Sequence, residues 1–87
     1  MEKSITSPEY ATFLHKLWAA RKKAGVTQTD LAARLGETQS FVSKCERGER
    51  RLDVIELRAF CQAFGLSVTR FIEDLDATLK SSSIRRR

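Results

Sequence analysis

The sequence predicts an all-α fold of five short helices packed as one compact domain. Apolar side chains recur at intervals of three and four residues along most of the 87-residue chain, as on the buried faces of amphipathic helices. The four glycines and the single proline stand where these stretches begin or end, and β-branched clusters are few. Helices separated by short turns are therefore expected.

The first helix is predicted to begin at the segment Ser7-Pro8-Glu9 and to run to about Ala24. A capping hydroxyl, a proline in the first turn and an acidic residue at the positive end of the helix dipole are typical of a helix start. Gly25 is expected to end it. Phe13 and Leu17 fall on its apolar stripe.

Two helices of about eight residues follow, joined by a tight turn. Thr27 is expected to cap the second helix, and Gly36 to end it in a left-handed conformation. Thr38 is expected to cap the third helix, which should extend to about Glu46 before Gly48 closes it. Two short helices joined by such a turn are typical of a helix-turn-helix.

The last two helices are predicted from a capping pair and a capping serine. Asp53 with Glu56 indicates the start of the fourth helix, and Ser67 opens the fifth. The inward face of the fourth helix is predicted to hold Val54, Leu57, Phe60, Cys61 and Phe64, and that of the fifth Val68, Phe71, Ile72, Leu75 and Leu79. The domain should then span residues 7–79, with 1–6 and 80–87 as flexible termini.

The excess of basic residues favours a polyanionic partner. The rest of the sequence argues against a membrane protein, a secreted protein, a metalloprotein and an enzyme. There are 16 Lys and Arg against 11 Asp and Glu, a formal net charge of +5. No apolar run has membrane-spanning length, and no signal-peptide core follows the N-terminus. Cys45 and Cys61 form neither a metal pattern nor a disulfide framework, and a lone His15 supplies no catalytic triad. We therefore expect no metal, no cofactor, no enzymatic activity and a cytoplasmic location.

The third helix carries the most informative surface. At helical spacing, Val42, Cys45 and Glu46 share one side and should face the body of the domain. The opposite side is short, hydrogen-bonding and cationic, and no acidic residue lies on it; it comprises Gln39, Ser40, Ser43, Lys44 and Arg47. Base edges in the major groove require such groups, because Gln can bind adenine and Lys can donate to guanine.

The central segment also resembles a known family. The stretch Arg21-x3-Gly25-Val26-Thr27-Gln28-x2-Leu31-Ala32-x2-Leu35-Gly36, followed by Gln39-x2-Val42-Ser43-Lys44-x-Glu46-x-Gly48, is similar to the Cro, phage-repressor or xenobiotic-response-element type of helix-turn-helix regulator. The resemblance covers roughly residues 10–76 and implies a lambda-repressor-like fold. Cys45, where the family often has a large aromatic residue, and Leu52, where proline is common, depart from the pattern.

The resemblance implies a role for each residue that matches the motif. Gln28 and Thr38 are expected to contact phosphates, with Thr38 also capping the third helix; Gln39, Ser40, Ser43 and Lys44 are expected to face bases; Arg47, Arg50 and Arg51 are expected to hold the DNA backbone. Arg21 and Glu46 match the family's buried ion pair, which joins the first helix to the end of the third.

A dimeric repressor of bacterial or phage origin, acting at the nucleoid, is the function that this resemblance implies. Its two recognition helices would read a roughly palindromic double-stranded operator, and Phe71, Leu75 and Leu79 are the predicted dimer surface. Two alternatives stay open. The same fold serves antitoxins and restriction–modification controllers, which have a protein or operon partner of their own, and it can serve as a helical protein-interaction module.

Overall fold

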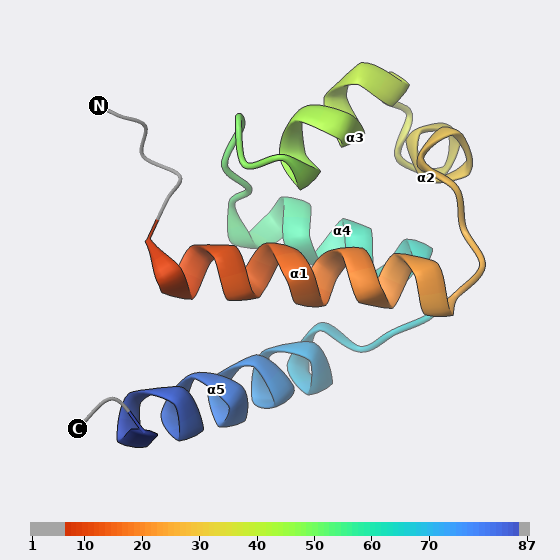
Figure 1. Cartoon of the computed structure of the whole chain (residues 1–87). Helices are drawn as coiled ribbons and strands as arrows, with labels where there is room; N and C mark the ends of the chain where they lie inside the picture. Colours follow the sequence, from red (N-terminus) through yellow and green to blue (C-terminus); the bar gives the residue numbers. More distant parts are fainter. Residues whose placement is uncertain (1–6, 86–87) are drawn as a thin grey trace.

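The computed structural model describes residues 7–85, and within that range it contains five α-helices and no strand. They are α1 (Pro8–Lys23), α2 (Gln28–Leu35), α3 (Gln39–Glu46), α4 (Val54–Ala63) and α5 (Val68–Arg85) (Figure 1). The predicted all-α, five-helix class is confirmed. The predicted flexibility of residues 1–6 and 86–87 concerns segments outside the described residues.

The predicted helix starts are confirmed by their capping hydrogen bonds. The Ser7 side chain accepts a hydrogen bond from the backbone N–H of Tyr10, so α1 begins where the sequence indicated. Capping boxes open α2 and α4: Thr27 pairs reciprocally with Asp30, and Asp53 with Glu56. Each box satisfies two backbone donors that a helix N-terminus otherwise leaves unpaired. These interactions are local, because each joins residues three positions apart in the chain.

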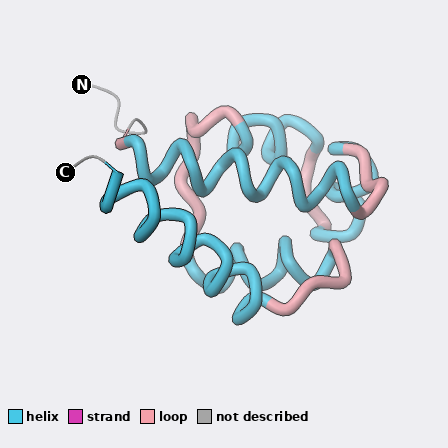
Figure 2. Tube along the Cα trace, turned by 60° about the horizontal axis from the view of Figure 1, so that its bottom comes forward, coloured by secondary structure: helices cyan, strands magenta, loops and turns pink. Residues whose placement is uncertain are grey.

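Helix α1 lies through the middle of the domain, with α3 on one side and α5 along the other (Figure 1). The turned view also shows α5 running beside α1 (Figure 2). Helix α2 packs against α3 and α4, and α4 packs against α5. The buried apolar side chains form one core, drawn from all five helices and the turn before α2: Phe13, Leu17, Val26, Leu31, Ala32, Val42, Cys45, Leu57, Phe60, Cys61 and Phe71.

None of the helices in residues 7–85 is both long enough and apolar enough to span a bilayer.

Helix α5 is longer than predicted. It continues to Arg85 instead of ending near Leu79, so residues 80–85 have helical backbone. The sequence after Leu79 holds no glycine or proline to stop the helix, and adding a residue to an existing helix is far easier than starting one. The predicted end of the fifth helix near Leu79 was therefore wrong, while the flexibility of residues 80–87 stays a prediction.

Two predicted apolar faces also differ from the structure. Phe71 was predicted to lie both on the inward face of the fifth helix and on a dimer surface. The first prediction is confirmed and the second is wrong, since Phe71 is buried in the core with its ring edge-on to that of Phe13. Conversely, Val54 and Ile72 were predicted to face inward, yet they are exposed. The stripe of α5 is wide, and the rotation of the helix against α1 and α4 decides which of its members are covered.

The turn between α2 and α3 provides a direct test of the local geometry. Gly36 has a φ of 69°, and an added Cβ would meet open space. A Gly36→Ala variant should therefore lose about 1–2 kcal/mol of unfolding free energy through backbone strain alone, without a clash. A Gly36→Asn variant is the matched control and should lose less, since Asn tolerates this conformation. Urea denaturation of the three proteins measures the difference, and equal stability of all three would contradict this account.

Candidate nucleic-acid interface

The α2–α3 turn sets one short helix across the other. Its two backbone hydrogen bonds run from Glu37 N to Ala32 O at 2.9 Å and from Gly36 N to Ala33 O at 3.3 Å. They satisfy the last carbonyls of α2 and end that helix in the manner of a Schellman motif. The Thr38 hydroxyl then accepts from the backbone N–H of Phe41, so its predicted capping role at α3 is confirmed.

A buried ion pair joins α1 to the end of α3. Arg21 Nε donates to Glu46 Oε2 at 2.6 Å, and Arg21 Nη2 donates to Oε1 at 3.1 Å. The two side chains are only 8% and 6% exposed, so this is the buried pair that the resemblance implied. Arg21 Nη1 also donates to the carbonyl of Val26 at 2.9 Å, which ties the α1–α2 turn to the same guanidinium. Such pairing and hydrogen bonding are what a desolvated charge requires.

Two glutamines extend this network to the outer end of α3. Gln28 Nε2 donates to Glu46 Oε1 at 2.9 Å, and Gln28 Oε1 accepts from Gln39 Nε2 at 2.6 Å. The sequence singled out Gln28 and Gln39 separately, for a phosphate and a base, and no spacing rule connected them. The structure brings them together. The buried carboxylate of Glu46 holds the side chain of Gln28, which in turn holds the exposed amide of Gln39.

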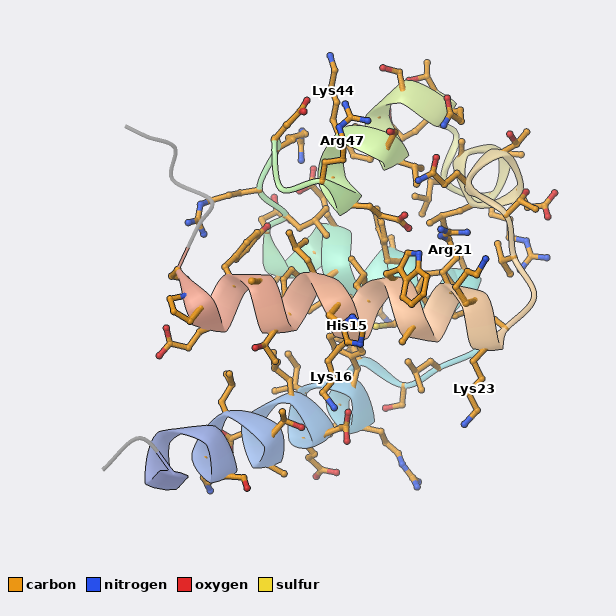
Figure 3. All side chains as sticks on the ribbon, in the orientation of Figure 1. His15, Lys16, Arg21, Lys23, Lys44 and Arg47 are labelled. Carbon is orange, nitrogen blue, oxygen red and sulfur yellow. The ribbon has the colours of Figure 1, made fainter. Side chains whose placement is uncertain are left out.

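The predicted outer face of α3 is confirmed as an open surface. Gln39, Ser40, Lys44 and Arg47 are exposed and Ser43 is half-buried, whereas Val42 and Cys45 on the opposite side are fully buried. Lys44 and Arg47 both point away from the body of the domain (Figure 3). Phe41, at the edge of this face, packs against the ring of Phe60. The outer face therefore offers amide, hydroxyl and cationic groups to solvent.

Arg47 is not a free cation. Its Nε and Nη2 donate to the two carboxylate oxygens of Glu49 at 2.9 and 3.0 Å, and its Nη1 donates to the hydroxyl of Ser43. The Arg47 guanidinium holds the pKa of Glu49 below its ordinary value through these hydrogen bonds. Sequence analysis missed Glu49, which lies beyond the end of α3 and folds back beside it.

Arg50 and Arg51 lie in the loop between α3 and α4, and each is tied to the domain. Arg50 donates to both oxygens of Glu56 at 3.0 and 2.8 Å, and its guanidinium stacks over Phe41, 4.8 Å from the ring centroid. Hydrogen bonds from Arg50 also lower the pKa of Glu56. Arg51 stacks over Tyr10 of α1, at 4.3 Å. The loop is therefore fastened to α1, α3 and α4, and both arginines stay at the surface.

Among the described residues, the cysteines and the histidine do not form a metal site. Cys45 and Cys61 are buried free thiols, and burial raises the pKa of each, as expected for unreactive core cysteines. Across residues 7–85 the structure shows no cluster of His, Cys, Asp and Glu that could hold a metal ion. His15 is exposed on α1, with its ring 5.8 Å from that of Trp18.

The buried pair gives a stability prediction. An Arg21→Met variant should lose about 3–5 kcal/mol of unfolding free energy, because Glu46 would keep a desolvated charge without a partner. Lys23→Met, a matched control on the exposed face of the same helix, should change it by less than about 0.5 kcal/mol.

The double variant Arg21→Met/Glu46→Leu separates pairing from side-chain size. It should recover part of the loss, since no charge stays buried. Denaturant titration of all four proteins gives the comparison, and strictly additive losses in the double variant would show that the two residues do not act as a pair.

Comparison with known proteins agrees with this geometry. The model of the helix-turn-helix family matches residues 19–71. The HTH-type transcriptional regulator y4dJ from Sinorhizobium fredii is 38% identical over 58 residues, which are 67% of this chain and 75% of that protein. The family match includes the α2–α3 unit and its turn.

Solved structures show the same fold. An XRE-family like protein from Pseudomonas syringae superposes with a TM-score of 0.78 at 50% identity, over 80% of this chain and 85% of that one. The clp gene regulator ClgR from Corynebacterium glutamicum, at 20% identity, superposes with a TM-score of 0.74 over 95% of this chain and 87% of its own, and shows the fold alone. The chain thus belongs to the XRE/Cro-type helix-turn-helix family of DNA-binding transcriptional regulators.

Proposed function

We propose that the chain is a sequence-specific regulator that places α3 in the major groove of double-stranded DNA. The observation that supports this most strongly is the open outer face of α3, backed by a fully buried inner face. Gln39, Ser40, Ser43 and Lys44 are the proposed base-reading residues. An exposed amide held by a neighbouring side chain is suited to bidentate recognition of adenine, and the Lys44 ammonium to guanine.

The proposed phosphate contacts surround this face. Gln28 and Thr38 stand at the starts of α2 and α3, where free backbone N–H groups attract anions. Arg47, Arg50 and Arg51 follow α3 in the chain and are proposed to fix its position on the duplex. Because Glu56 offsets part of the charge of Arg50, we expect a phosphate contact of Arg50 to change the salt dependence of binding by less than about one unit of slope.

We further propose that the regulator is a homodimeric repressor that reads a palindromic operator in the bacterial cytoplasm. Val54 and Ile55, at the start of α4, are 66% and 71% exposed, the largest exposed fractions among the big apolar side chains described. Val54, next to Ile55 in the chain, borders a groove of about 400 Å³ whose walls include Leu52, Leu75 and Leu79. This surface keeps Leu75 and Leu79 of the predicted dimer surface and leaves out Phe71, which is buried. Contact with a different protein is the competing use of such an exposed apolar surface.

Random-site selection tests sequence recognition. Wild-type protein should recover one motif with two related half-sites about one helical turn apart, and Gln39→Ala should relax the preference at one position of each half-site, at a cost of about 1–3 kcal/mol for the preferred base. Arg70→Gln, on the exposed surface of α5, is the control and should leave the motif unchanged. Recovery of no motif by the wild-type protein at physiological salt would refute the proposal.

Analytical ultracentrifugation tests the dimer surface. Ile55→Glu should convert the dimer to a folded monomer, because an exposed residue can change without damage to the core, whereas a charge in an apolar interface is strongly unfavourable. Glu9→Gln, at the same groove, removes a charge instead of introducing one, and this variant should stay dimeric. A wild-type protein that sediments as a monomer at operator-binding concentrations would rule out the dimer.

A further inference from the structure

The carboxylate of Glu49 neutralises part of the positive charge on the outer face of α3. Arg47 forms a two-bond fork with the carboxylate of Glu49, and the third nitrogen of its guanidinium donates to the hydroxyl of Ser43, one turn earlier on α3. We name these three residues the Arg47 clamp. Arg47 lies among the cationic groups that point away from the domain, beside Lys44 (Figure 3). The clamp therefore lies on the proposed DNA-contacting surface itself.

The backbone fixes Glu49 in this place. Glu49 N donates to Lys44 O at 2.9 Å, and Gly48 N donates to Cys45 O at 3.1 Å. These are the paired bonds of a Schellman motif, which Gly48 makes possible with a φ of 80°. The motif turns the chain back, so that Glu49 leaves the end of α3 next to the last turn of the helix. The carboxylate meets Arg47 because of the turn, and an exposed ion pair without such an anchor would have little consequence.

Glu49 also interacts with the second cation of the face. Lys44 contributes to lowering the pKa of Glu49 through its charge, although the hydrogen bonds from Arg47 are the larger cause. The charge of one carboxylate thus acts on both cations of the second half of α3, although its hydrogen bonds go to Arg47. The positive potential available to a phosphate is reduced at this point, while the amide and hydroxyl groups at the start of the helix are untouched.

We propose that Glu49 is a specificity-determining residue that competes with DNA phosphate for Arg47, and this inference rests on the proposed function. Binding to an arbitrary duplex depends almost entirely on phosphate contacts. An arbitrary duplex is held by phosphates alone, so a phosphate that takes Arg47 fully must displace Glu49, which weakens that complex. On the operator, base contacts fix the position of α3, and Arg47 can contact the backbone through its remaining N–H groups with the clamp intact. Glu49 therefore lowers nonspecific binding more than operator binding.

Glu49→Gln is the test variant, measured against the selected operator and a scrambled duplex over a range of salt concentrations. Affinity for the scrambled duplex should rise about two- to fivefold, the size of an exposed ion pair, and its dependence on log salt should steepen by about one unit. Operator affinity should rise less, so the ratio of the two affinities should fall. Glu73→Gln on exposed α5 makes the same charge change elsewhere and should leave the ratio unchanged.

An Arg47→Gln background shows whether Glu49 acts through Arg47. There, Glu49→Gln should have at most a small effect on either duplex. Equal effects of Glu49→Gln and Glu73→Gln, or an undiminished effect without Arg47, would overturn the proposal. The NMR signal of the Arg47 Nε–H in the free protein reports the clamp independently of DNA and should shift in Glu49→Gln alone. If the NMR signal shifts but the wild-type protein binds no DNA sequence preferentially, the proposed function fails and the clamp stands. If the wild-type protein binds a preferred sequence but the NMR signal does not shift, the clamp is refuted and the proposed function stands.

Discussion

The buried pair of Arg21 and Glu46 is the constraint on which the arrangement of the recognition surface depends. A helix of eight residues is too short to be stable alone, so the direction of α3 must be set by what it packs against and what holds its ends. Thr38 caps one end, and Glu46 anchors the other to α1 with a desolvated ion pair. Because hydrogen bonds in a buried network are directional, the pair limits both the position and the rotation of α3.

The carboxylate of Glu46 also positions the side chain of Gln39, at the other end of α3. Glu46 accepts from Gln28, and Gln28 accepts from Gln39, so an interaction inside the domain reaches an exposed amide through two hydrogen bonds. Glu49 acts in a comparable way on Arg47 at the other end of the surface. Side chains that lie on the outer face of α3 are therefore held in advance of any partner, which reduces the conformational entropy lost on binding.

Capping and spacing rules predicted most of the fold and the outer face of α3. They did not predict Glu49 as the ion-pair partner of Arg47 on that face. Capping hydroxyls, paired acids and turn glycines act over three or four residues, so Thr27, Gly36 and Asp53 could be assigned from their neighbours alone. The exposure of Val54 and Ile72, both predicted to face inward, depends on how α4 and α5 rotate against the rest of the domain, which periodicity does not determine. Glu49 was missed because its contact with Arg47 follows from the path of the loop, which no spacing in the sequence reveals.

The central claim, that the outer face of α3 meets the duplex, is tested most directly by NMR titration of the labelled protein with operator DNA. The account predicts that the largest shifts occur in the side-chain amide of Gln39 and the backbone amides of Ser40 and Lys44, together with the N-terminal amides of α2. Signals from exposed α5, such as that of Glu73, should change little. Shifts concentrated on α5, with α3 unaffected, would contradict the account.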